Sequence, residues 1–244
     1  MDYGRIAMLP ERQRLARALK QHVEGLRAFG VTVLPSARNA SARPMEISKV
    51  QRLARLAEEV ERCRRCPLYR SRTHAVVSDG TPQAQLVFIG EAPGRDEDLQ
   101  GKPFVGAAGQ LLTKMIDAMG LKRQDVYICN VLKDRPPGNR APLPEEVAAC
   151  LPFLREQLAI VQPKVICVLG AVAARALLGP QVSIMNIRGE MREYEGIPLV
   201  PTFHPAYLLR NPSAKRLAWE DLKKVKRLLA DLNRPMADVG DHRA

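Results

Sequence analysis

The sequence lacks an apolar segment long enough to cross a bilayer. Its longest apolar run, VICVLGAVAA at 165–174, is much shorter than the ~20 residues that a membrane-spanning helix needs. The opening residues, MDYGRIAMLPERQRLARALK, also contain no apolar core of signal-peptide length. These absences argue against a membrane-spanning or exported chain, and we expect a cytoplasmic protein.

Cysteines are too few, and odd in number, for a disulfide scaffold. A chain with five cysteines and no export signal favours metal or cluster binding instead. Cys63 and Cys66 form a C-x-x-C pair directly after an expected helix, and Cys150 lies inside another helical pattern. Cys167, within VICVLG, is expected to be a buried core thiol.

Acidic residues are scarce relative to basic ones. The chain has 38 Lys and Arg against 26 Asp and Glu, which gives a formal net charge of +12. Such an excess favours a polyanionic partner, with nucleic acid first and an anionic membrane surface second. The alternative is a solvated, arginine-rich surface without a partner. The length of 244 residues fits one sizeable domain or two small ones, and the 46% hydrophobic content is typical of a globular protein.

The N-terminal part reads differently from the rest of the chain. Residues 11–29 carry leucine and valine at helical spacing, and SARNASARP at 36–44 is typical of a linker. We therefore expect a helical extension and linker at 1–48, a main domain at 49–235 and a flexible tail at 236–244.

From residue 86 onward, short apolar runs alternate with helical patterns. Continuous apolar strands separated by helices predict a parallel sheet covered on both faces. We expect an α/β protein, a three-layer α/β/α sandwich with a four-stranded parallel sheet. The expected strands are LVFIG (86–90), VYICNV (126–131), VICVLG (165–170) and PLVPTF (198–203).

Two further helices are expected from apolar stripes. The first starts near Glu46 and carries Val50, Leu53, Leu56, Ala57 and Val60 on one face. The second spans 213–233 and carries Ala218, Leu222, Val225, Leu229 and Leu232.

Right-handed crossovers place the loops after parallel strands at one edge of the sheet, where such folds bind ligands. The unusual residues of this chain lie in three such loops, at 90–106, 129–146 and 203–213. They are therefore expected to form one pocket. Neither a Walker-type loop nor Gly-x-Gly-x-x-Gly is present, so a phosphate-cradling loop is excluded on its usual patterns.

The first of these loops, GEAPGRDEDLQGKPFVG, is the most acidic. Asp96, Glu97 and Asp98 could hold a metal, but consecutive residues do not all point one way, so we interpret them as a charged, solvated turn. Glu91 differs because it adjoins the strand end and a glycine-rich turn, and we expect it at the pocket floor.

Several motifs occur in order with sensible spacing: GEAPG, G-x-PFVG, VYICNVLK-x-RPP and HPAYLLRNP, together with the C-x-x-C pair. They resemble family 4 uracil-DNA glycosylases, the iron–sulfur branch of that superfamily, over about residues 60 to 230. The resemblance implies a monomeric DNA repair enzyme. It would flip uracil out of single- or double-stranded DNA and hydrolyse the N-glycosidic bond, leaving an abasic site.

The resemblance also implies roles for individual residues. Glu91 matches the carboxylate that positions water and faces the sugar, and His204 matches the imidazole that donates to uracil O2. Phe104 matches the stacking platform, and Asn130 the amide at the base edge, with Gly90 and Ala92 beside them in the base site. The alternatives are structural: a carboxylate on backbone N–H groups, a core phenylalanine and an asparagine satisfying its own loop.

The DNA contacts follow from the same resemblance. Tyr207, Leu208, Leu209 and Arg210 match the loop that enters the minor groove and fills the space of the extruded base. The grip on phosphates would be independent of sequence. Candidates for it are Arg62, Arg64, Arg65, Arg135, Arg140, Arg210 and Lys215.

The family holds a structural [4Fe–4S] cluster with four cysteines, and this chain departs from that pattern. Cys63, Cys66 and Cys150 match, but the fourth position is Asp134. Asp134 would bind one iron through oxygen; a three-iron cluster, a substitution by Cys129, or zinc on three cysteines and one aspartate are alternatives.

Two other functions compete with the enzyme. One is a non-catalytic nucleic-acid-binding protein with a structural cluster or zinc, and the other is a redox protein using the cluster. An acid, an amide and an imidazole at separate strand ends favour the enzyme, because a binding module has no need of that set.

Overall fold

The computed structural model describes residues 47–234, together with Lys20 and Glu24. The chain divides into two compact units, 1–46 and 47–244, and the second contains all the strands of the described residues. The predicted linker and tail lie outside the described residues, as does the predicted N-terminal helix apart from those two positions. In the part of the chain described here, no helix is both long and apolar enough to cross a membrane.

One six-stranded sheet forms the centre of the fold, in the order β1-β3-β2-β4-β6-β5. Its four central strands pair in parallel, and the strand at each edge is antiparallel to its neighbour. The strands are β1 (Asp79–Gly80), β2 (Leu86–Gly90), β3 (Tyr127–Asn130), β4 (Val165–Leu169), β5 (Arg192–Tyr194) and β6 (Ile197–Thr202). The predicted α/β class and the four parallel strands are confirmed.

The two edge strands were not predicted. They are only two and three residues long, too short to produce an alternating apolar pattern. β5 joins β6 through Glu195 and Gly196, whose φ angles of 49° and 80° are those of a tight hairpin turn. Short edge strands offer little unpaired backbone to another chain, which is a common way of protecting a sheet edge.

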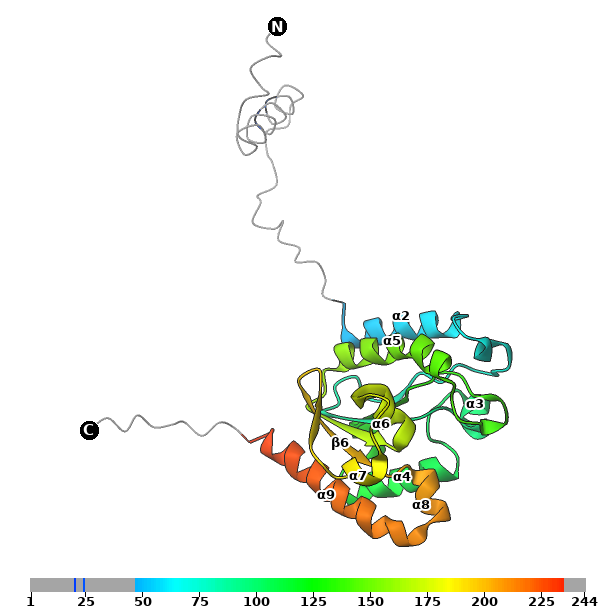
Figure 1. Ribbon diagram of the computed structural model, residues 1–244. Coiled ribbons are helices and arrows are strands. Elements are labelled where there is room, and N and C mark those ends of the chain that lie inside the picture. The colour runs from blue at the N-terminus through cyan, green and yellow to red at the C-terminus, as the bar shows by residue number, and fades with distance from the viewer. Residues whose placement is uncertain (1–19, 21–23, 25–46, 235–244) are drawn as a thin grey trace, which may run out of the picture. The chain divides into compact units, whose positions relative to one another are not determined.

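Helices cover both faces of the sheet and make it the middle of three layers. Figure 1 shows α2 and α5 together on one side, with α8 and α9 on the opposite side. The helices are α2 (Lys49–Glu61), α3 (Arg95–Gln100), α4 (Ala107–Ala118), α5 (Pro144–Val161), α6 (Ala171–Leu178), α7 (Ile184–Ile187), α8 (Pro205–Arg210) and α9 (Lys215–Asp231).

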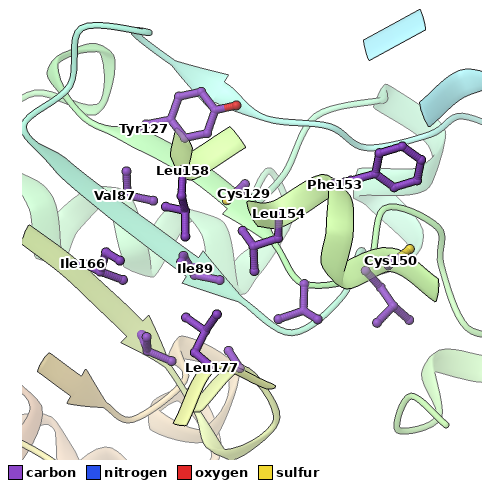
Figure 2. Packing of buried hydrophobic residues seen from close by; sticks show 14 of the residues in the cluster. Val87, Ile89, Tyr127, Cys129, Cys150, Phe153, Leu154, Leu158, Ile166 and Leu177 are labelled. Carbon is purple, nitrogen blue, oxygen red and sulfur yellow. The ribbon is translucent and has the colours of Figure 1, made fainter. Parts of the chain in front are cut away.

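The strand residues alternate between two hydrophobic cores, as the pleat of a strand requires. Val87, Ile89 and Ile166 face the core beneath α5, where Figure 2 shows them opposite Leu154 and Leu158. The intervening strand residues face α4 and α9 in the second core, which includes the fully buried Cys167 predicted as a core thiol.

The apolar faces predicted for α2 and α9 are buried in the middle of each helix and exposed at one end. Ser48 caps α2 in a capping box with Gln51, and Leu53, Leu56 and Val60 are buried beneath the helix. Val50 is 56% exposed, because it lies in the first turn, where the helix leaves the core. Leu232 is also exposed, because α9 ends before it.

Candidate active site

The parallel strands end at one edge of the sheet, and the loops that follow them enclose a cavity of about 380 Å³. Glu91 follows β2, Asn130 ends β3 and His204 follows β6, and all three line this cavity together with Phe104 and Ala92. The four side chains predicted to share a pocket are therefore brought together. Gly90 lies directly behind them, paired in register with Asn130.

Gly90 is glycine because the pocket floor leaves no space for a side chain. A Cβ at this position would lie 2.3 Å from Asn130 Oδ1 and 2.4 Å from the Phe104 ring. Backbone therefore passes directly under the amide and the aromatic ring, a close approach that glycine permits.

We predict that Gly90→Ala abolishes most activity while the protein still folds. The added methyl must displace the Asn130 amide and the Phe104 ring, and a misplacement of about 1 Å costs about 10²-fold in rate. The measurement is kcat/KM for the reaction proposed below. Gly196→Ala is the control, because Gly196 has a φ of 80° but nothing within 4 Å of an added Cβ. Gly196→Ala should lower stability and leave activity intact. Wild-type activity in Gly90→Ala would contradict the prediction.

Phe104 is held in a left-handed backbone conformation, with a φ of 54°, which is uncommon for a non-glycine residue. Gly109 of α4 packs against its main chain so closely that a Cβ there would meet the Phe104 carbonyl oxygen at 1.8 Å. The ring is 5% exposed, and its centroid lies 5.6 Å from that of His204 at a tilt of 31°. Phe104 is thus fixed as one wall of the cavity.

Our interpretation of the acidic residues as a solvated turn was wrong for Glu97 and Asp98, whereas Asp96 is 46% exposed in its side chain and pairs with the exposed Arg95. Glu97 accepts hydrogen bonds from the backbone N–H groups of Gly94, Val105 and Gly106, at 2.9–3.1 Å. Asp98 is buried and accepts from the backbone N–H and the hydroxyl of Thr73, both at 2.8 Å. Glu97 thereby fixes the turn that carries Phe104, and Asp98 ties α3 to the segment at Thr73.

A local signal for Glu97 was present in the sequence. In a capping box, a glutamate three residues after the N-cap accepts from the N-cap backbone N–H; only this half of the motif is possible here, because a glycine N-cap has no side chain to return a bond. Gly94 and Glu97 have this spacing at the start of α3. The reach of Glu97 to Val105 and Gly106, by contrast, depends on how the loop folds back.

His204 caps α8 through one ring nitrogen and leaves the other free to donate. Its Nδ1 accepts a hydrogen bond from the backbone N–H of Ala206 at 3.1 Å, so the proton of the neutral ring lies on Nε2. Burial, assisted by the charge of Arg210, lowers the pKa of His204 to about 4. At neutral pH the ring is therefore a neutral hydrogen-bond donor in the cavity wall.

Glu91 and Asn130 present two further polar groups to the cavity. Burial raises the pKa of the Glu91 carboxyl above its ordinary value. Asn130 is 1% exposed, and its Oδ1 is the one buried side-chain polar atom without a hydrogen-bond partner among the described residues. A buried polar atom without a partner costs about 1–3 kcal/mol, a cost that a hydrogen-bond donor at this oxygen would remove.

The segment predicted to enter DNA forms α8, and its residues differ in exposure. Leu209 is 43% exposed, and Tyr207 and Arg210 line the cavity mouth. Leu208 differs from our expectation: it is 1% exposed and packs in the core with α4 and α9. Adjacent residues of a helix point in different directions, so Leu208 packs into the core while Leu209 faces outward.

Five of the seven proposed phosphate contacts already have partners within the protein. Arg62 pairs with Glu58, Arg64 lies over the Tyr69 ring, and Arg135 donates to Asn139 Oδ1. Arg140 forms a bidentate ion pair with Glu146, at 2.6 and 2.8 Å, and Arg65 stacks over the Phe153 ring at 4.7 Å. Arg140 still lines the cavity and is 39% exposed in its side chain, so its outer face remains accessible.

The cysteines of the predicted metal set are free thiols. Burial raises the pKa values of Cys66 and Cys150, and the charge of Asp134 acts in the same direction on both, which shows that the three groups are neighbours. Cys63 Sγ accepts from the Arg65 backbone N–H at 3.5 Å. Within the described residues, no group of three or more His, Cys, Asp or Glu side chains is arranged to hold a metal ion.

Asp134 has a strong partner of another kind. Its two carboxylate oxygens accept from the Arg72 guanidinium at 3.0 and 3.1 Å, and the aspartate side chain is 4% exposed. Arg72 also donates to the carbonyl oxygens of Val60 and Glu61, just before the C-x-x-C pair. The donor types, three thiols and a carboxylate held by arginine, include the usual ligands of iron–sulfur clusters, but in the described residues these side chains are not gathered into one metal site.

Comparison with known proteins agrees with this geometry. Residues 77–223 match the family model described as the uracil DNA glycosylase superfamily. The chain is 49% identical over 175 residues to the type-4 uracil-DNA glycosylase of Thermotoga maritima, covering 70% of this chain and 91% of the relative. It is 44% identical over 186 residues to that of Sulfurisphaera tokodaii, covering 72% and 84%.

A type-5 uracil-DNA glycosylase of Pyrobaculum aerophilum is less similar, with 33% identity over 179 residues that cover 66% of this chain and 75% of the relative. The higher identity to the type-4 proteins separates the two types. The chain therefore belongs to the uracil-DNA glycosylase superfamily and, within it, to the type-4 family.

Proposed function

We infer that the protein is a uracil-DNA glycosylase of base excision repair. It takes uracil out of DNA and hydrolyses the bond between the base and the sugar, leaving an abasic site. The observation that carries this proposal is a single cavity lined by the amide of Asn130, a neutral imidazole and a carboxylate, in which the buried Asn130 Oδ1 has no hydrogen-bond partner.

Uracil supplies what this cavity lacks. Its N3–H group is a donor for Asn130 Oδ1, and its O4 is an acceptor for the Nδ2 group of the same amide. Cytosine carries an acceptor at N3 and a donor at N4, so it reverses both contacts. The Phe104 ring offers a flat apolar surface on which a flipped base stacks.

The reaction breaks the bond between C1′ and N1, and the bonding electron pair leaves with the base. His204 Nε2–H is proposed to donate to uracil O2, where negative charge develops as the bond breaks. Glu91 is proposed to face the sugar, favour its positive charge and position the water whose oxygen bonds to C1′. The water's proton passes to the Glu91 carboxylate.

DNA is proposed to bind across the mouth of the cavity. Leu209 projects from α8 and would fill the space left by the extruded base, with Tyr207 and Arg210 beside it. The excess of basic residues supplies contacts to phosphates that do not depend on sequence. Single- and double-stranded DNA are both expected substrates, because the base is read outside the stack.

A cluster is proposed to be held by Cys63, Cys66 and Cys150, with Asp134 at the fourth position. When bound, it would supply a structural link between the end of α2, the loop after β3 and α5, without taking part in excision. Because Asp134 also binds Arg72, its attachment to iron would be weaker than that of a thiolate.

We predict that Asp134→Cys binds iron more firmly than the wild-type protein, because a fourth thiolate replaces a carboxylate that arginine competes for. Iron per chain and visible absorption during incubation with a chelator measure this directly. Asp134→Ser is the matched control, since it breaks the Arg72 ion pair equally but adds no thiolate. Equal iron loss from Asp134→Cys and Asp134→Ser would argue against a ligand at this position.

The proposed function is tested with an oligonucleotide that contains one uracil. The protein is incubated with single- and double-stranded forms, and alkali then converts abasic sites to strand breaks. Breaks at uracil, and none in the matched thymine oligonucleotide, are expected. Binding of the uracil oligonucleotide without any break would instead identify a non-catalytic DNA-binding protein.

A further inference from the structure

Lys133 is buried beneath the active site without an acidic partner. Its side chain is 1% exposed, and it takes part in none of the ion pairs among the described residues. Lysine is almost never fully buried unless it is paired, so its retention here calls for a role.

The ammonium group of Lys133 is fixed by two short hydrogen bonds. Nζ donates to the backbone oxygen of Asn130 and to Oε1 of Gln157, each at 2.6 Å. Gln157 of α5 is fixed in turn, because its Nε2 donates to the Val77 carbonyl at 2.9 Å and to the Tyr127 hydroxyl at 3.0 Å. Figure 2 shows the Tyr127 hydroxyl on the α5 side of the sheet.

This network ends at the residue whose side-chain oxygen has no partner. Asn130 is the last residue of β3, and the chain leaves the sheet immediately after it. Its backbone oxygen accepts from Lys133, whereas its Oδ1 is buried without a partner and the residue lines the cavity. An unrestrained asparagine would turn to satisfy that oxygen, since leaving it buried and unpaired is costly.

We propose that Lys133 is a positioning residue for base recognition: it locks the main chain at Asn130, so that the amide faces the cavity before a base arrives. Gln157 orients the lysine, so α5 also helps to hold the Asn130 backbone in place. The inference rests on the proposed function, because it concerns the amide that reads uracil. A preorganised amide lowers the cost of ordering the site when the base binds.

The test is a double-mutant cycle on the full chain, using Lys133→Met, Asn130→Ala and the double variant. Excision is measured under single-turnover conditions, and thermal unfolding is recorded for each protein. If Lys133 acts through Asn130, the single change should slow excision about tenfold or more. The same change in the Asn130→Ala background should alter the rate by less than about twofold, because coupled residues are not additive.

Equal rate losses from Lys133→Met in both backgrounds would overturn the proposal and assign the lysine a purely structural role. Lys226→Met is the control for loss of one positive charge, since Lys226 is exposed on α9, and it should leave excision unchanged. Where Lys133→Met does not fold, Lys133→Gln completes the same cycle, because it keeps an amide donor without the charge.

The cycle also separates this proposal from the proposed function. Asn130→Ala alone tests whether the amide reads the base. Wild-type excision by Asn130→Ala would remove that role and the Lys133 proposal with it. If Asn130→Ala greatly slows excision and the effects of the two changes are fully additive in the double variant, only the proposal for Lys133 is contradicted.

Discussion

Replacing His204 by alanine is expected to slow uracil excision by about 10²–10³-fold, the usual cost of removing one donor that stabilises a developing anion. The cap on α8 fixes Nδ1 as an acceptor, so Nε2–H is the donor that the variant loses. The pKa of His204 is lowered to about 4, so the ring acts as a neutral donor. The rate should therefore show no step near the ordinary histidine pKa of about 6.5.

The control for this variant is His204→Asn. An asparagine at the N-cap position of α8 can accept from the Ala206 N–H and so preserves the helix start. We expect its thermal unfolding to match the wild type while its excision rate remains far lower. A rate within tenfold of the wild type in both variants would remove His204 from the chemistry.

Replacing Glu91 by glutamine is expected to slow excision by about 10²–10⁴-fold, because the neutral amide neither favours the sugar cation nor accepts a proton. Single-turnover rates with a uracil oligonucleotide measure the loss. Glutamine keeps the size of the side chain, so the cavity and DNA binding should be unaffected. Unchanged DNA affinity with unchanged excision would show that the carboxylate has no part in the reaction.

Glu91 is also expected to set the acid limit of activity. The carboxylate must be ionised, and burial raises its pKa, so excision should fall as the pH drops through a value above the ordinary glutamate range. His204 would become protonated only near pH 4, below that limit. The excision rate of Glu91→Gln should therefore be low and nearly independent of pH down to about pH 4, where His204 becomes protonated.

The same shift has a consequence for stability. A carboxyl group whose pKa is higher in the folded state than in the unfolded state disfavours folding once it is ionised, and this cost grows as the pH rises through the folded pKa. Glu91→Gln removes the cost. At pH 7 the variant should unfold at the same temperature as the wild type or a higher one, which is the trade-off expected at an active site.

The parallel core and the positions of the main site residues were predictable because they depend on short-range patterns. Continuous apolar runs identify strands buried on both faces, and β2 has the predicted bounds. Loops that follow parallel strands meet at one edge of the sheet, and this rule alone predicts that Glu91, Asn130 and His204 lie close together.

Other features depended on how distant segments meet. Glu97 and Asp98 looked like surface charges, but the return of the Phe104 loop and of residue 73 surrounds them with backbone N–H groups. Leu208 and Leu209 are chemically alike, and only the packing of α8 against α4 and α9 decides which one faces outward. Lys133 and Gln157 lie 24 residues apart and meet because α5 packs over β3.

The sequence by itself determined the four parallel strands, the apolar interior and the chemical groups available at the ends of those strands. Only the tertiary structure decided which of those groups are satisfied and which are left for a ligand. The physical reason is that periodicity and charge are properties of neighbouring residues. Burial and hydrogen-bond satisfaction, such as the unpaired Oδ1 of Asn130 and the Arg72 pairing of Asp134, depend on segments brought together by folding.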